Sequence, residues 1–295
     1  MGYIKQSVHR LTRRFTVVGA LALLGLYAGC GAPVQHEPEG IIAGTSLIAD
    51  IVADLTEQTV QTFTLLPSSS CPSQFDMKTD DISRLQQARM VLLHPWQMNL
   101  ANIRRTLEAA KLPDDRARIV DVAGNWMLPE MQTAAVARLA ALLGDHHPEH
   151  RGAIQARAAM RRAAIAAATE KARALMSAQD AASRVVLCNE MQAPFVHWVG
   201  FDIADTYARP EDWSVAETAR LVRLGRERHV SLVIDNLQSG GMRMSETIAR
   251  DIGAIHVVLS NFPNGFPDTP TWETTFMNNL NRLQEALARL DAHDP

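Results

Sequence analysis

The sequence predicts an α/β protein with two lobes, each a parallel sheet covered by helices, joined by one long backbone helix, with a ligand cleft between the lobes. Two observations lead to this fold class. From Ile41 onward, short apolar runs alternate with longer amphipathic ones, which is typical of parallel sheets. One stretch of about 32 residues, rich in Ala, Arg, Met and Leu, interrupts that alternation and predicts a long helix. At 295 residues, the chain is long enough for two such lobes.

The first 29 residues are typical of an export signal. Residues 17–29 are apolar but span only about 20 Å as a helix, short of the ~30 Å hydrocarbon core of a membrane. The segment ends Leu-Tyr-Ala-Gly-Cys30, which resembles a bacterial lipobox. We therefore expect cleavage before Cys30, a lipid on Cys30, and a flexible tether over residues 30–40. The protein would then be periplasmic or on the cell surface, anchored to a membrane.

Residues 41–147 are predicted to form the N-terminal lobe. Four short apolar runs predict its strands: Ile41–Ala43, Val60–Leu66, Met90–Leu93 and Ile119–Val122. Amphipathic stretches between and after them predict its helices: Ser46–Glu57, Thr79–Gln87, Asn99–Ala110 and Pro129–Leu143. In the second of these, Thr79 is expected to be the N-cap, with Asp80 and Asp81 in the first turn, where the helix dipole favours acidic side chains.

Residues 148–182 are predicted to form the backbone helix. Its apolar stripe consists mostly of Ala, which suits one helix lying close to both lobes better than a coiled coil.

Residues 183–295 are predicted to form the C-terminal lobe. Its expected strands are Val185–Leu187, Ile203–Tyr207, Leu232–Ile234 and Ile255–Leu259. Its expected helices are Met191–Val199, Val215–His229, Met242–Ile252 and Trp272–Leu290.

Charge and motif content exclude several classes of function. The formal charge is -3, and without residues 1–29 the chain has 25 basic against 32 acidic residues, or -7, so nucleic-acid binding is not expected. The chain contains no Gly-rich phosphate loop, G-x-S-x-G or His-Glu-x-x-His motif, which argues against an enzyme.

Cys71 and Cys188 fall in opposite lobes, and a disulfide between them would lock the cleft.

In the order and spacing of its segments, the chain resembles the metal-type solute-binding proteins of bacterial ABC importers, the zinc and manganese receptors. The matching segments are Ile41–Asp50, Leu65–Pro67 with Phe75 and Asp81, Trp126 with Pro129, and Phe276 with Asn279 and Leu280. The resemblance implies capture of a ligand in the cleft, delivery to a permease with its ATPase, small lobe movement and a monomer.

The resemblance also implies where the metal ligands of such receptors fall in this chain, and none of the four positions has its usual residue. Ser73 stands where the first histidine belongs, and Gly124 stands two residues before Trp126, in place of the second. The third and fourth ligands fall on Asn189 and Asn261. Hydroxyl and amide side chains are poor zinc ligands and glycine has no side chain, so the sequence does not predict the ordinary site.

The loops after the predicted strands supply the candidate cleft residues, because strand carboxyl ends face the crevice in such folds. Tryptophans gather there with amides and hydroxyls, as an organic ligand requires. The candidates are Ser70, Cys71, Ser73, Gln74, Asp76, His94, Trp96, Asn125, Trp126, Asn189, Glu190, Gln192, Asp235, Asn236, Gln238 and Asn261.

Several hypotheses remain open at this stage. The cleft binds a small organic molecule or a metal complex, or else a relocated site built from Cys71, His94 and Glu190 binds a soft transition metal such as Cu(I). No resident cofactor is expected beyond such a transported metal ion or chelate. A non-transport adhesin or assembly lipoprotein is the alternative outside the transport class.

Overall fold

The computed structural model describes residues 40–113, 115–179, 181–209, 213–240 and 242–292. The expected signal peptide, Cys30 and nearly all of the expected tether lie outside these residues. Residues 38–295 form one compact unit. Within the described residues, no helix is long and apolar enough to cross a membrane.

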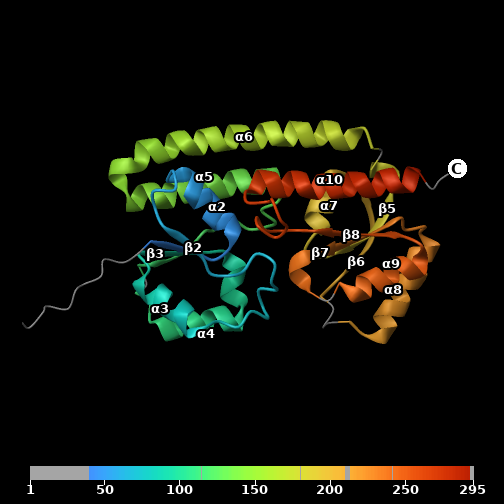
Figure 1. The fold of residues 1–295 in the computed structure, drawn as a ribbon, viewed down its shortest axis with the longest axis horizontal. Coiled ribbons are helices and arrows are strands. Elements are labelled where there is room, and N and C mark those ends of the chain that lie inside the picture. The colour runs from blue at the N-terminus through green and yellow to red at the C-terminus, as the bar shows by residue number, and fades with distance from the viewer. Residues whose placement is uncertain (1–39, 114, 180, 210–212, 241, 293–295) are drawn as a thin grey trace, which may run out of the picture. The chain divides into compact units, whose positions relative to one another are not determined.

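Two four-stranded parallel sheets form the centres of the two lobes (Figure 1). The first has the order β2-β1-β3-β4 and the second β6-β5-β7-β8, so the lobes share one topology. The strands are β1 Ile41–Ala43, β2 Thr62–Thr64, β3 Met90–Leu93, β4 Ala117–Ile119, β5 Val185–Asn189, β6 Asp202–Tyr207, β7 Leu232–Asn236 and β8 Ile255–Leu259. This arrangement confirms the predicted fold class.

Helices cover both faces of each sheet. They are α2 Ser46–Leu55, α3 Thr79–Gln87, α4 Ala101–Ala110, α5 Pro129–His146, α6 Arg151–Ser177, α7 Ala193–Val199, α8 Val215–Glu227, α9 Arg243–Ile252 and α10 Trp272–Asp291. In Figure 1, α3 and α4 lie on one side of the first sheet, and α8 and α9 lie on the same side of the second. The helix α6 runs along the other side, against α2, α5 and α10.

Side chains from successive strand residues enter different cores, because a strand alternates its faces. Ile41 and Ala43 enter a large core shared with α5, α6 and α10, whereas Ile42 enters a smaller core under α3 and α4. The second sheet behaves likewise, with Leu187 and Val233 packed in a third core. The inner strands β1 and β3 are therefore continuous apolar runs, as expected of a sheet covered on both faces.

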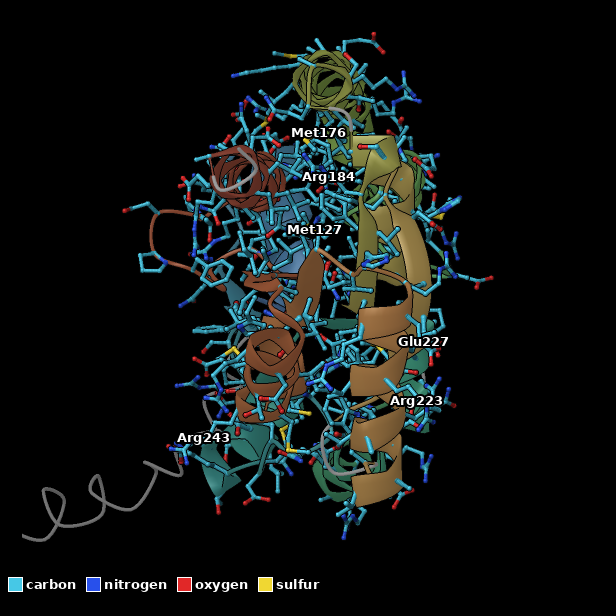
Figure 2. The ribbon with its side chains drawn as sticks, turned by 90° about the vertical axis from the view of Figure 1, so that its right-hand side faces the viewer. Met127, Met176, Arg184, Arg223, Glu227 and Arg243 are labelled. Atoms are coloured by element: carbon cyan, nitrogen blue, oxygen red, sulfur yellow. The ribbon has the colours of Figure 1, made fainter. Side chains whose placement is uncertain are left out.

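The view in Figure 2 shows the same division between interior and surface. Met127 and Met176 are buried within the large core. Arg223, Glu227 and Arg243 lie on the exposed faces of α8 and α9.

The backbone helix α6 has 27 residues, about 40 Å at the usual rise, and is shorter than the predicted 148–182 segment. Single 3-10 turns, Pro148–His150 and Ala181–Ser183, flank it. Ile154, Ala158, Ile165 and Ala172 are buried in the large core, which contains residues of both lobes. The prediction that one helix packs against both lobes is confirmed.

Some predicted boundaries are wrong for local reasons. Within the described residues, the edge strand β2 pairs with β1 alone, over Thr62–Thr64, so it is shorter than predicted. Lys78 rather than Thr79 is the N-cap of α3. A 3-10 turn, Pro95–Asn99, precedes α4, and α7 begins near Pro194, since proline favours the first helical turn.

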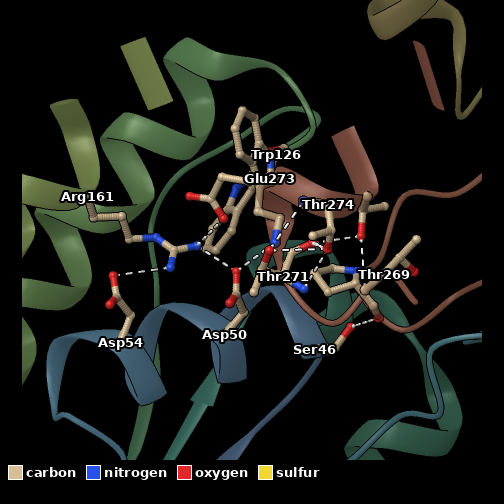
Figure 3. Close-up of polar contacts among 12 residues, drawn as sticks. Ser46, Asp50, Asp54, Trp126, Arg161, Thr269, Thr271, Glu273 and Thr274 are labelled. Atoms are coloured by element: carbon tan, nitrogen blue, oxygen red, sulfur yellow. Dashed lines mark hydrogen bonds and ion pairs between the residues drawn. The ribbon is translucent and has the colours of Figure 1, made fainter. Parts of the chain in front are cut away.

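A buried ion pair joins α6 to the helices of both lobes (Figure 3). Arg161 in α6 donates to Asp50 of α2 at 2.5 Å, and the same carboxylate oxygen accepts the backbone N–H of Trp272, at the start of α10, at 2.9 Å. The side chains of Arg161 and Asp50 are 4% and 8% exposed. The start of α10 is thereby fixed against the N-terminal lobe.

Candidate functional site

A cavity of about 560 Å3 is lined by residues that follow the carboxyl ends of strands in both lobes. Its walls include the loops after β3, β4, β5, β6, β7 and β8. Among the predicted cleft residues, those that line it are Cys71, Ser73, His94, Trp96, Asn125, Trp126, Glu190, Asn236, Gln238 and Asn261. The cavity is of the size that small-molecule sites have in proteins.

The other predicted residues do not line the cavity. Ser70, Gln74 and Asp76 lie on the loop before α3, with Gln74 and Asp76 exposed. Asp235 points away, toward Ser245 of α9, and lies 3.5 Å from His256. Because β7 alternates its faces, Asp235 shares the side of Val233, which packs in the core under α8 and α9.

Asn189 and Gln192 are fully buried behind the cavity wall. The Asn189 Oδ1 atom accepts the N–H of Met191 at 3.0 Å, and Gln192 Nε2 donates to Asn236 Oδ1 at 3.0 Å. These two residues hold the loop after β5, so their role in the structure is to position the wall.

Arg209, which is not among the predicted cleft residues, lines the cavity from the loop after β6. Its Nη1 donates to Ser73 Oγ in the other lobe at 2.7 Å. The remaining lining residues that the candidate set omitted are mostly apolar or small: Leu47, Pro72, Asn99, Leu100, Gly124, Met191, Pro194, Ser239 and Phe262.

Aromatic side chains form one wall of the cavity. The His94 ring stacks on Trp96 with 5.4 Å between ring centroids and lies 4.1 Å from Trp126. Burial lowers the pKa of His94 to about 3, so the imidazole is neutral at pH 7. Its Nε2 is hydrogen-bonded to Thr45 Oγ1 at 2.8 Å. His94 therefore supports the two indoles and adds no charge to the site.

Amide side chains from both lobes form a hydrogen-bonded network at the cavity. Asn125 Nδ2 of the N-terminal lobe donates to Asn261 Oδ1 and to the Met191 carbonyl, each at 3.0 Å. Asn261 Nδ2 donates to that same carbonyl at 3.1 Å, and its backbone N–H donates to Gln238 Oε1 at 3.0 Å. The network connects the lobes directly, through neutral groups.

At the four positions where the resemblance to the zinc and manganese receptors implies metal ligands, the structure has groups that do not suit a bare ion. Ser73 Oγ accepts from Arg209, and Asn189 and Asn261 belong to the amide contacts described above. Gly124 has φ +95°, a backbone conformation that side chains with a Cβ rarely adopt. A histidine at this position would be strained in the present backbone.

The residues of the predicted relocated metal site are not arranged as a set of metal ligands. Cys71, His94 and Glu190 line the same cavity, yet the described residues contain no group of three or more His, Cys, Asp or Glu that could hold a metal ion. Cys71 and Cys188 are free thiols, so the disulfide considered from the sequence does not form. Cys71 Sγ instead lies 3.3 Å from Ser73 Oγ.

Two parallel-sheet lobes on a common backbone helix, with a cavity between strand carboxyl ends, define a two-lobed binding protein. Residues 41–286 match the family model described as zinc-uptake complex component A, periplasmic. The chain belongs to this family, as its sequence pattern predicted. Membership supports a metal-type solute-binding role in an ABC importer and a place outside the cytoplasm. No curated protein sequence matches the chain.

Solved structures of similar fold are distant in sequence. A periplasmic metal-binding protein from Candidatus Liberibacter asiaticus in its cadmium-bound form has a TM-score of 0.71 at 13% identity, covering 84% of this chain and 99% of that one. A ZnuA crystal structure has a TM-score of 0.70 at 16% identity, with the same coverage of both chains. At these identities, the likeness establishes the fold alone.

Proposed function

We propose that this protein is the solute-binding component of an ABC importer and that its cleft binds a small organic molecule or a metal complex, not a bare zinc or manganese ion. It delivers the ligand to a membrane permease energised by an ATPase. A lipid on Cys30 anchors it to a membrane, and α6 limits the movement of the lobes.

The observation that carries the proposal is the chemistry of the four ligand positions together with the cavity. A tetrahedral zinc site needs His, Cys or carboxylate groups about 2.0–2.3 Å from the ion. Here Ser73, Gly124, Asn189 and Asn261 occupy the positions, beside a cavity of about 560 Å3. A cavity of this size with indole walls and neutral amides fits a molecule of many atoms.

Tryptophan fluorescence tests the proposal, because Trp96 and Trp126 line the cavity. The unit of residues 38–295 is titrated with zinc, manganese, copper(I) and fractions of a small-molecule extract. We expect the metals alone to leave the emission unchanged and an extract fraction to change it. The Trp96→Phe variant should reduce the response. Trp213→Phe is the matched control, since Trp213 does not line this cavity and packs against Tyr207 at 5.1 Å between centroids.

A response to zinc alone at one equivalent, lost on substitution of cavity residues, would refute the proposal. Copper(I) binding that depends on Cys71 would instead support the relocated metal site. Lipidation is tested separately: Cys30→Ala should move the protein from the membrane fraction to the soluble fraction.

A further inference from the structure

The amide side chains of the cavity use their hydrogen bonds to join the two lobes. Each amide has two N–H donors. Asn125 gives one to the Met191 carbonyl and one to Asn261 Oδ1, each at 3.0 Å. Gln238 gives one to the Ser68 carbonyl of the N-terminal lobe at 2.7 Å, and the other within its own lobe at 2.9 Å. In this arrangement, the donors of both amides hold the lobes together and are already occupied.

The charged side chains among the lining residues are not buried. Glu190 is exposed, where water and salt weaken its field. Arg209 is half-buried and donates to Ser73 Oγ at 2.7 Å. His94 is buried but neutral at pH 7, because burial lowers its pKa to about 3. A charged group that leaves water for a protein interior needs a buried partner of opposite charge, so this cavity favours a ligand without charge.

Apolar side chains of both lobes form much of the remaining wall. Leu47 and Leu100 come from the N-terminal lobe, and Met191 and Phe262 come from the C-terminal lobe. Met191 is 46% exposed, although its side chain is large and apolar. A thioether packs favourably against an aromatic ring. A ligand that covers Met191 therefore gains free energy by removing apolar surface from water.

Trp96 offers the accessible aromatic face of the cavity. Trp126 is 2% exposed and lies against His94, whereas Trp96 is half-buried. The His94 ring stacks on one face of Trp96, with 24° between the ring planes. A flat ligand ring can therefore stack on the other face, in the offset geometry that aromatic pairs prefer.

We infer that the cleft binds an uncharged, flat aromatic molecule, which stacks on Trp96 and packs against Met191 while the amides of Asn125 and Gln238 hold the lobes together. This inference rests on the proposed function, since it names the class of the organic ligand. The aromatic molecule is bound either by itself or as the organic part of an uncharged metal complex.

Naphthalenes that share one ring system and differ in charge test the inference on the unit of residues 38–295. The probes are 2-naphthamide, which is uncharged, 2-naphthoate, which is an anion, and 2-naphthylmethylammonium, which is a cation. Binding is followed by calorimetry at pH 7. We expect the amide to bind at least tenfold more tightly than either ion, with a negative heat-capacity change and equal affinity at low and high salt.

A chelating probe distinguishes the two forms of the ligand. 8-Hydroxyquinoline is uncharged at pH 7, and two of its anions form an uncharged complex with one zinc ion. Binding of 8-hydroxyquinoline without zinc indicates that the aromatic molecule is bound by itself. Binding that requires zinc indicates a metal complex.

Variants at Trp96 connect the effect to the proposed face. Trp96→Ala should weaken binding of 2-naphthamide about tenfold or more, because the stacked ring is lost. Trp96→Phe keeps a smaller ring and should give a smaller loss. Trp213→Phe is the matched control, because Trp213 is not among the residues that line the cavity and packs against Tyr207.

The possible failures are distinguishable. If either ion binds as tightly as 2-naphthamide, or if neither Trp96 variant weakens its binding, the inference is refuted while an organic ligand stands. If none of these probes binds and zinc alone binds at one equivalent in the cleft, both the inference and the proposed function are refuted. If neither the probes nor zinc bind, the inference is refuted.

Discussion

Removing the guanidinium of Arg161 should destabilise the protein far more than a typical surface substitution. Arg161 lies on α6 and contacts Asp50 at 2.5 Å and Asp54 at 3.3 Å, with Glu273 at 4.0 Å (Figure 3). The variant Arg161→Met keeps much of the apolar stem and deletes the charge. It leaves the Asp50 carboxylate, 8% exposed, without its cationic partner.

The magnitude follows from burial. Breaking a buried ion pair by removing one partner costs about 3–5 kcal/mol, because the remaining charge is not compensated. For a unit of this size, each kcal/mol lowers the melting temperature by about 2–4 °C, so a fall of roughly 6–20 °C is expected. Burial raises the pKa of Asp50 and the Arg161 guanidinium opposes that shift. The loss should therefore shrink at acidic pH, where the unpaired carboxyl takes up a proton.

Urea and thermal unfolding, followed by circular dichroism, measure this loss. The double variant Asp50→Asn/Arg161→Met should be more stable than Arg161→Met, because the buried charge is gone and an amide oxygen can still accept from the Trp272 N–H. Arg173→Met is the matched control on the same helix. Its pair with Glu170 is 63% and 72% exposed, so less than about 1 kcal/mol should be lost.

Two results would refute this reasoning. One is a loss below about 1 kcal/mol for Arg161→Met, which would show that the pair contributes no more than a surface pair. The other is a double variant less stable than Arg161→Met, which would mean that the Asp50 carboxylate is not a destabilising, uncompensated charge once Arg161 is removed.

Three further predictions follow from the cavity walls. Burial lowers the pKa of His94 from 6.5 in the unfolded chain to about 3 in the folded protein, so the free energy of unfolding should fall by up to ~1.4 kcal/mol per pH unit as the pH drops below 6.5. Urea unfolding at several pH values measures this dependence. A His94→Gln variant whose free energy of unfolding depends on pH as steeply as that of the unchanged protein would contradict the prediction. Cys71 should react with a maleimide in the native protein, whereas Cys188 should react only after unfolding, because burial raises the pKa of its thiol. Mass spectrometry of the labelled peptides shows which cysteine has reacted. Gly124→Ala should lower stability by about 1 kcal/mol or more in thermal unfolding, because φ is +95°; an unchanged melting temperature would be inconsistent with this backbone.

Much of the fold could be predicted from local sequence signals. Strands β1 and β3 have their predicted bounds, because each is an apolar run that both faces of a sheet bury. The half-buried edge strand β8 also has its predicted bounds. The bounds of β2 could not be predicted, since its length depends on pairing with a single neighbour.

The residues of the candidate site were harder to predict than the strands, because contacts between distant parts of the chain decide which side chains reach the cavity. Arg209 lies in a loop without periodicity, and its contact with Ser73 joins residues 136 positions apart, which no local pattern reveals. The orientation of Asp235 could have been predicted from strand alternation, because it lies one residue from Ile234, which enters the large core. The residues at the four positions where the resemblance implies metal ligands were visible in the sequence, but the amide network of Asn125 and Asn261 required the structure.

Equilibrium dialysis against zinc, with metal analysis of the protein, tests the absence of a bare-ion site most directly. The variant His146→Gln/His147→Gln/His150→Gln is used, so that the histidines beside Glu149 at the α5–α6 turn cannot contribute loosely bound zinc. We predict no stoichiometric zinc at micromolar concentration. One tightly bound equivalent that is lost on substituting Cys71 or Glu190 would contradict the proposal that the cleft has no bare-ion site.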